Sequence, residues 1–275
     1  MSGKHWLLGQ GTIYPDTIES GGTKHADVIK THHNRVPRVQ QLIAQGRVIE
    51  PIKNLYKDEV RAIGTLLKLP KNLIERHPFP GPGLAIRVLA SQGAKEKTKP
   101  YTLNAIRYFQ LPIQSVGVQG DERSYAHPAL IIEKMSWKKL RTLAPAITNK
   151  RKDVNRVLYL ISGKPNDIAR ATVQKKDVSK ERLDLLRIID DIVQKEIHSL
   201  KHIWQFPAVL IPFGHKYGES IVLRPVESEE AMTVSWAKIP PPILKKIIKK
   251  ITALDAVDFI FFDVTNKPPG TIEWE

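Results

Sequence analysis

Hydrophobic residues recur along the chain with the periods that mark helices and strands. Spacings of three and four predict amphipathic helices over 57–67, 183–197 and 243–251. Short apolar runs predict strands over 208–211 and 220–223. Residues 91–100 are polar and rich in lysine, which predicts a loop. Further strands are expected at 114–118, 129–132, 154–161 and 257–264, and further helices at about 101–110 and from 135 to about 148.

The second half of this pattern repeats the first. Ser136-Trp137 corresponds to Ser235-Trp236, and Ser162-Gly163-Lys164-Pro165 corresponds to Thr265-Asn266-Lys267-Pro268. A repeat of this length indicates a duplicated α-β-β-α-β unit. The copies differ in a complementary way, because the motif around Arg123 occurs only in the first copy and the tail that ends the chain only in the second.

A proline- and glycine-rich stretch separates the repeats from the N-terminal part. Residues 78–83 hold three prolines and two glycines. Proline lacks the N–H that a helix or a paired strand needs, and glycine lets the main chain approach a partner closely. Leu84-Ala85-Ile86 follows at once, which predicts a loop that is tied down at its end. Such a stretch is either an interdomain linker or a bare loop whose main chain contacts a ligand.

Composition narrows the class of protein. The 275 residues are 41% hydrophobic, enough for two or three small domains, and they include no cysteine. No apolar run approaches the ~20 residues of a membrane-spanning helix, and the N-terminus does not resemble a signal peptide, so we expect a cytoplasmic protein. The net charge of +15 attracts anions, but few aromatic residues lie among the lysines to stack on bases.

Polar residues near the N-terminus are candidates for chemistry. Asp16 and Glu19 lie three apart, on one face of a helical turn. Ser20-Gly21-Gly22 continues into Thr23-Lys24-His25, so it predicts a flexible loop over 20–35 rather than a phosphate cradle. His32 and His33 are adjacent and have no second ligand cluster nearby, which favours a surface pair over a metal site.

Five motifs in order resemble the GMP synthase family. The most specific is His-Pro-Phe-Pro-Gly-Pro-Gly-Leu-Ala-Ile-Arg-Val at 77–88. The others are Gly11–Ser20, Lys30–Asn34, Lys57–Arg61 and the tail Lys267–Glu275. The duplicated form is similar to the eukaryotic kind. The Ser-Gly-Gly-x-Asp-Ser loop that binds ATP in this superfamily has no match in the chain.

The resemblance implies an α+β chain. It would consist of the tail end of an α/β ATP-pyrophosphatase domain with its lid, followed by two α-β-β-α-β two-layer units. The expected bounds are 1–88 for the first part, 89–166 for the first dimerisation-type unit, and 167–275 for the second unit with the nucleotide-binding tail. Because the two copies could pack together within one chain, we expect a monomer or a weak homodimer.

The resemblance also implies a reaction. The family converts xanthosine monophosphate (XMP) to GMP with ATP, Mg and ammonia from glutamine, releasing AMP and pyrophosphate. Partners would be the upstream ATP-pyrophosphatase and glutamine amidotransferase domains or subunits. Because neither the ATP loop nor an amidotransferase cysteine occurs in these residues, we expect no synthesis of GMP by this chain alone.

Site residues follow from the motifs that match. Catalytic residues would be Asp16, Glu19, Lys30, His32, His33, Lys57 and Asp58. Residues that bind XMP would be Pro80, Gly81, Gly83, Arg123, Gln205, Lys267, Ile272 and Glu273. Arg123 and Lys267 would contact phosphate, and Ile272 and Glu273 the base. No metal site is expected within the chain.

Two other classes of function remain open at this stage. The basic charge fits a module that binds RNA through phosphates, whose affinity would fall steeply with salt. The pattern also fits an assembly subunit with no ligand of its own. Without any site, Lys57-Asp58 would simply start a helix and Arg123 would form a surface salt bridge with Asp121 or Glu122. Gln205 would lie at an exposed helix end.

Overall fold

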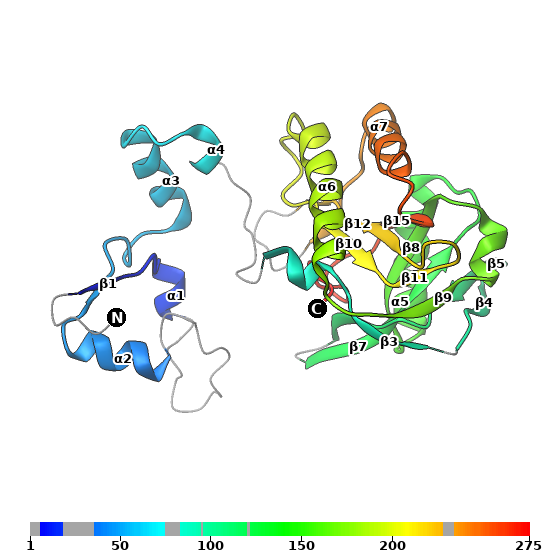
Figure 1. Ribbon diagram of the computed structural model, residues 1–275, viewed down its shortest axis with the longest axis horizontal. Coiled ribbons are helices and arrows are strands. Elements are labelled where there is room, and N and C mark those ends of the chain that lie inside the picture. The colour runs from blue at the N-terminus through cyan, green and yellow to red at the C-terminus, as the bar shows by residue number, and fades with distance from the viewer. Residues whose placement is uncertain (1–5, 19–35, 75–82, 95, 120–121, 228–233) are drawn as a thin grey trace. The chain divides into compact units, whose positions relative to one another are not determined.

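The computed structural model describes residues 6–18, 36–74, 83–94, 96–119, 122–227 and 234–275 (Figure 1). The chain divides into two compact units, residues 1–76 and 77–275. None of the helices in the described ranges is long and apolar enough to cross a membrane. The domain bounds expected at 88 and 166 stay predictions.

The first unit consists of short elements. Strands β1 (Leu8–Gly9) and β2 (Val48–Ile49) pair in parallel. Its helices are α1 (Tyr14–Ile18), α2 (Pro37–Ala44), α3 (Lys57–Leu66) and α4 (Lys71–Ile74). Helix α3 begins as its sequence predicts, because Glu59 accepts a hydrogen bond from the main-chain N–H of Tyr56 at 2.7 Å and so caps the first turn.

One mixed sheet organises the second unit. Its strands are β4 (Lys99–Leu103), β5 (Ile106–Gln110), β6 (Ser115–Gln119), β7 (Glu122–Ile131), β8 (Val154–Ser162), β10 (Ala208–Ile211), β12 (Ser220–Leu223) and β15 (Phe259–Asp263). Their order is β10-β12-β15-β8-β7-β5-β4, with β6 beside β7. Strands β7 and β8 are parallel, as are β12 and β15, whereas β8 and β15 pair antiparallel at the centre.

Helices cover one face of this sheet and a small second sheet covers the other. Helices α5 (Trp137–Lys150), α6 (Lys180–Ile197) and α7 (Pro241–Thr252) share a core with Leu210, Ile221 and Phe262 (Figure 1). The alternate residues Val209, Val222 and Phe261 pack in a separate core on the other face. Because both faces are buried, these strands are continuously apolar, which explains their clear signal in the sequence.

The remaining elements are short. Strands β3 (Ser91–Ala94), β9 (Thr172–Lys176) and β11 (Phe213–Gly214) form the small sheet in the order β11-β9-β3. Strands β13 (Val226–Glu227) and β14 (Ser235–Trp236) pair antiparallel. Two 3₁₀ helices, η2 (Gly83–Arg87) and η3 (Pro165–Ala169), complete the set.

Two predictions for the start of the first repeat are wrong. Residues 101–110 are not a helix but the hairpin of β4 and β5, in which Tyr101 stacks on Tyr108 with ring centroids 5.7 Å apart. Its two turn residues, Asn104 and Ala105, both have positive φ, as the tight turns between antiparallel strands require. Residues 91–94, predicted as loop, form β3. The hairpins of the first repeat therefore begin on strands alone, whereas in the second repeat helix α6 follows the short strand β9.

Candidate functional site

The C-terminal tail, residues 267–275, lies against strand β6 of the other repeat. The N–H of Val116 donates to the carbonyl of Trp274 at 2.9 Å, and the N–H of Val118 donates to the carbonyl of Pro269 at 2.7 Å. Main-chain pairing of this kind fixes the path of the tail. The tail and the hairpin of β6 and β7 thus join the two repeats at one place.

Gly117 permits this close approach. A β-carbon at Gly117 would lie 2.7 Å from the carbonyl oxygen of Pro269 and 2.8 Å from side-chain atoms of Asn155. Gly117 forms an antiparallel bridge with Gly270 of the tail. Any side chain at 117 would therefore force the tail away from β6.

Arg156 of β8 hydrogen-bonds to both the tail and β6. Its guanidinium donates to the carbonyls of Val116 at 3.0 Å and Glu273 at 2.7 Å, and to the hydroxyl of Thr271 at 2.8 Å. It also forms an ion pair with Asp263 at 3.1 Å. Nη1 and Nη2 of this completely buried side chain therefore have acceptors, whereas its buried Nε has none among the described residues.

Asp263 is shared by two buried arginines. Arg224 approaches the same carboxylate oxygen at 2.9 Å and donates to the carbonyls of Thr265 and Gly270, at 3.1 and 3.4 Å. Desolvation, followed by the charge of Arg224, lowers the pKa of Arg156. Neither Arg156 nor Arg224 belongs to a motif in the sequence. The available signal was a charged residue within the apolar run that forms β8.

Glu273 does not point into solvent. Its two carboxylate oxygens accept from Nε and Nη2 of Arg87, at 3.0 and 2.8 Å. Arg87 ends the 3₁₀ helix η2, whose first residue Gly83 has a φ of 70°, a conformation that favours glycine. The expected contact of Glu273 with a base stays a prediction, and a ligand would have to compete with Arg87 for this carboxylate.

Three other predicted residues lie in the tail or in the strands near it. The N–H of Lys267 donates to the carbonyl of Val234 at 2.8 Å. Gln205 is buried and its main chain bridges to Val226, in the strand that pairs with β14. Arg123 is exposed and lies opposite Val118, the residue that bonds to Pro269. Arg123 and the tail therefore flank the same short segment of β6.

The remaining predicted residues belong to the N-terminal part or to undescribed stretches. The carboxylate of Asp16 accepts from the N–H of Ile13 at 3.0 Å. Lys57 and Asp58 are exposed in the first turn of α3, where partial desolvation and then the charge of Arg61 lower the pKa of Lys57. Glu19, Lys30, His32, His33, Pro80 and Gly81 lie outside the described residues, as does the loop 20–35.

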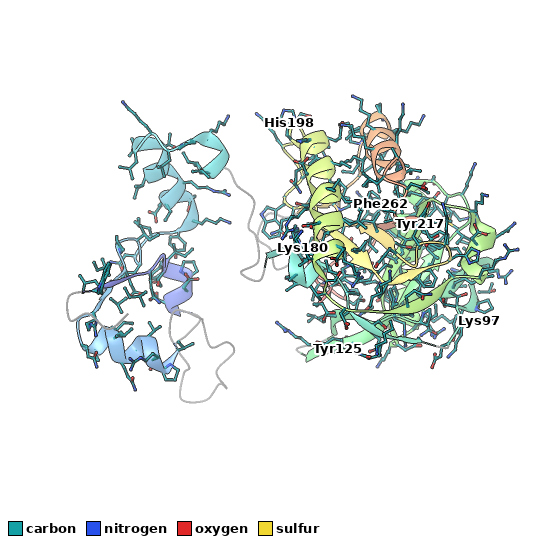
Figure 2. The ribbon with its side chains drawn as sticks, in the orientation of Figure 1. Lys97, Tyr125, Lys180, His198, Tyr217 and Phe262 are labelled. Atoms are coloured by element: carbon teal, nitrogen blue, oxygen red, sulfur yellow. The ribbon has the colours of Figure 1, made fainter. Side chains whose placement is uncertain are left out.

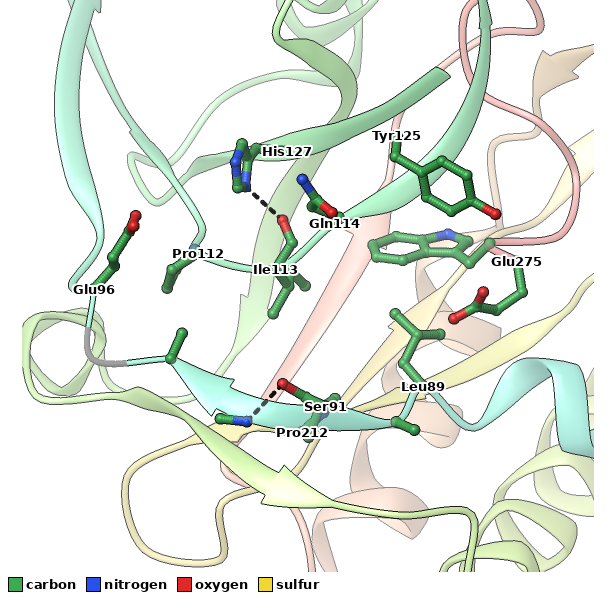
Figure 3. Close-up of a pocket in the computed structure, with 14 residues that line it drawn as sticks. Leu89, Ser91, Glu96, Pro112, Ile113, Gln114, Tyr125, His127, Pro212 and Glu275 are labelled. Atoms are coloured by element: carbon green, nitrogen blue, oxygen red, sulfur yellow. Dashed lines mark hydrogen bonds between the residues drawn. The ribbon is translucent and has the colours of Figure 1, made fainter. Parts of the chain in front are cut away.

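A pocket of about 480 Å³ adjoins the end of the tail (Figure 3). Leu89 and Ser91 line one side, His127 lies on another, and Glu275 lies at the end nearest Tyr125. Nδ1 of His127 lies 3.0 and 2.7 Å from the carbonyls of Leu111 and Ile113, so this nitrogen carries the proton. Among the described residues, none of those predicted to bind XMP lines this pocket.

Buried and exposed side chains of the second unit can be followed in the stick view. Phe262 lies within the second unit, whereas Lys97, Tyr125 and Lys180 lie at its outside (Figure 2). No group of three or more potential metal ligands occurs among the residues that the structure describes.

Comparisons with known proteins agree on one family. Residues 190–274 match the family described as "GMP synthase C terminal domain". A probable GMP synthase [glutamine-hydrolyzing] of Leptospira interrogans is 48% identical over 98% of this chain and 47% of its own length. The corresponding protein of Caenorhabditis elegans is 32% identical over 98% and 48%, and a GMP synthase of Leifsonia xyli is 34% identical over 98% and 39%.

These relatives are ligases that carry the glutamine-hydrolysing description. Residues 190–274 thus match the C-terminal domain of GMP synthases, and 98% of the chain aligns with a portion of these relatives. It spans about half the length of the curated relatives it matches.

Proposed function

We propose that this chain binds XMP within a complete GMP synthase. In that reaction ATP transfers an adenylyl group to O2 of the purine, with loss of pyrophosphate. Ammonia released from glutamine then attacks C2, and AMP leaves to give GMP. Two observations support this role: residues 190–274 match the C-terminal domain of the family, and the tail that holds three of the predicted residues pairs with β6 next to Arg123.

The observation that carries the proposal is the seating of the tail. The tail comes from the second repeat, and the hairpin that receives it comes from the first. Pro269 of the tail bonds to Val118, which lies opposite Arg123 of the first repeat, and Lys267 pairs with Val234 two residues before Pro269. The side chains of Arg123 and Lys267 would then supply phosphate contacts from the two repeats. Gln205, Ile272 and Glu273 would complete the contacts to the nucleotide, with main-chain groups of Pro80, Gly81 and Gly83.

The other parts of the proposal concern the complete protein. Lys30, His32 and His33 would form a lid over ATP, with Asp16, Glu19, Lys57 and Asp58 at the same synthetase site. ATP with Mg would bind to an ATP-pyrophosphatase domain, and ammonia would come from an amidotransferase domain or subunit. We propose a cytoplasmic monomer or weak homodimer, in which the two repeats supply both halves of the XMP site in one chain.

Calorimetry with the full-length protein and XMP tests the central claim. We expect Lys267→Ala to weaken XMP binding by ~1.5–3 kcal/mol, the range for a hydrogen bond to a charged group. Lys245→Ala is the matched control, because it removes an exposed lysine from α7. An unchanged dissociation constant for Lys267→Ala would remove Lys267 from the phosphate site.

Two further measurements separate the proposal from its alternatives. The 275-residue chain alone should bind XMP and form no GMP from XMP, ATP, Mg and ammonia. Random single-stranded RNA should bind more weakly than XMP at physiological salt. Tight RNA binding that falls steeply with salt, without XMP binding, would support the RNA-binding alternative instead.

A further inference from the structure

Arg87 lies between two carboxylates that come from different elements. Its side chain is 5% exposed. Nε and Nη2 form the two-pronged pair with Glu273 of the tail, at 3.0 and 2.8 Å. Nη1 lies 3.8 Å from Oδ1 of Asp190, which projects from α6. The guanidinium therefore directs one edge to Glu273 and presents Nη1 to Asp190.

These two contacts are unequal. Glu273 has both oxygens hydrogen-bonded to Arg87, which is the strong geometry for this pair. Asp190 is too far from Nη1 for a hydrogen bond, and its buried Oδ1 accepts none. Burial raises the pKa of Asp190, against the opposing effect of Arg87. Burying a carboxylate oxygen without a hydrogen-bond donor costs free energy. A donor that moved to Oδ1 of Asp190 would therefore recover part of that free energy.

Under the proposed function, Glu273 also binds the base of the nucleotide. A base that offers ring N–H groups needs the same carboxylate oxygens that Arg87 now occupies. Releasing Glu273 would break the two-pronged ion pair of a buried guanidinium, which is unfavourable. A replacement partner within reach would offset that cost.

We propose that Arg87 is a positioning residue that exchanges Glu273 for Asp190 when the nucleotide binds. Glu273 turns toward the base, and Nη1 of Arg87 closes on Oδ1 of Asp190 to form the hydrogen bond that is missing in the free protein. Asp190 thus lowers the cost of releasing Glu273. The inference rests on the proposed function, because it takes XMP as the ligand of Glu273.

The test compares neutral isosteres in the full-length protein by calorimetry with XMP. Asp190→Asn removes the charge that would receive Arg87, so we expect XMP to bind about tenfold more weakly, the effect of roughly one charge-assisted hydrogen bond. Asp191→Asn is the control, because Asp191 is exposed on the same helix and pairs with Lys195. We expect that control to stay within about twofold of the native affinity.

The native complex tests the exchange without any substitution. A crystal structure with XMP should show Glu273 on the base and Nη1 of Arg87 within ~3.2 Å of Asp190. Glu273 still paired with Arg87 in that complex would overturn the exchange. Native affinity in Asp190→Asn, together with weaker binding in Glu273→Gln, would overturn it too and leave the proposed function intact. Absence of XMP binding by the native protein would overturn the proposed function, and the exchange with it.

Discussion

Tyr159 of β8 lies directly opposite Phe262 of β15. The two residues also occupy corresponding places in the repeats, because each precedes by three the start of the matching motifs at Ser162 and Thr265. The neighbouring pairs of this register are Leu158 with Asp263 and Leu160 with Phe261. With Tyr159 matched to Phe262, Leu158 corresponds to Phe261 and Leu160 to Asp263, so interchanging the two strands turns each of these pairs into the other. A local pseudo-twofold axis therefore passes between Tyr159 and Phe262.

The corresponding tryptophans of the repeats meet beside this axis, which gives a prediction for stability. Trp137 and Trp236 have ring centroids 5.6 Å apart, and Trp236 is 1% exposed. We expect Trp236→Ala to lower the free energy of unfolding by about 3–5 kcal/mol. In a double-mutant cycle with Trp137→Ala, measured by urea denaturation, we expect a coupling of about 0.5–1.5 kcal/mol.

A control cycle shows whether that coupling is specific. Phe213 belongs to the core on the opposite face of the sheet, so Phe213→Ala and Trp137→Ala should have additive effects. If the two tryptophans were also additive, they would not couple the repeats.

The strands and helices that the sequence predicted best are those with a single strong period. Helices α6 and α7 follow their three- and four-residue spacing because one face of each is buried, and strands β10 and β12 are continuously apolar because both of their faces are buried. The hairpin of β4 and β5 was missed because its turn, Asn104-Ala105, lacks the glycine that usually marks positive φ.

The site was predictable only in part, for a different reason. Motifs identified Lys267, Arg123 and Glu273 as candidates, but the contacts that place them join residues far apart in the chain. Arg156 reaches Glu273 across 117 positions, and Arg87 reaches it across 186. No local pattern encodes such pairings, and a buried arginine in an apolar strand has the same appearance as an interrupted strand.

The close approach of the tail to Gly117 gives a second prediction. Gly117→Ala places a methyl group against the carbonyl of Pro269 and the side chain of Asn155. We expect a loss of about 1–3 kcal/mol in the free energy of unfolding, the usual range for overpacking. We also expect faster hydrogen exchange at the amides of Gly270 and Val118, as well as weaker XMP binding.

The matched control is Gly64→Ala. Gly64 lies within helix α3, where a new β-carbon would meet only side-chain atoms at 3.4 Å or more. We expect this change to be neutral or to stabilise the helix by up to about 1 kcal/mol. Native exchange rates of the tail in Gly117→Ala would contradict the role of this glycine.

Asp190 gives a prediction for the dependence of stability on pH. Burial raises its pKa in the folded protein above the value in the unfolded chain, and the facing groups are Arg87, Glu273 and Asp191. The folded state then binds the proton more readily, so the favourable contribution of this carboxyl is present at low pH and is lost as pH rises through the folded pKa. We expect native stability to fall relative to Asp190→Asn as pH rises from about 4 to 7.

Urea denaturation across that range measures the slope. Asp191→Asn is the control, because it removes the same charge from an exposed position of α6. The change of unfolding free energy with pH in Asp190→Asn is compared with the change in this control. The prediction is wrong if the native protein becomes more stable than Asp190→Asn as pH rises. That result would mean that the attraction of Arg87 lowers the pKa of Asp190 by more than burial raises it.

Arg156 carries the last prediction, because it joins the core to the tail. Arg156→Met keeps much of the volume but removes the partner of Asp263 and the donors to Val116, Thr271 and Glu273. Breaking a buried ion pair by removing one partner costs about 3–5 kcal/mol. We expect that loss in urea denaturation, with faster hydrogen exchange of the tail and weaker XMP binding.

Two further variants separate charge from geometry. Arg151→Met makes the same change in an arginine that is partly exposed and pairs with Asp153, so it should cost about 1 kcal/mol or less. Arg156→Lys keeps the charge near Asp263 but loses the planar fork, so we expect it to recover part of the stability and little of the tail's protection. If Arg156→Lys restored both, charge alone would hold the tail; if Arg156→Met left the tail protected, the pairing with β6 would suffice without Arg156.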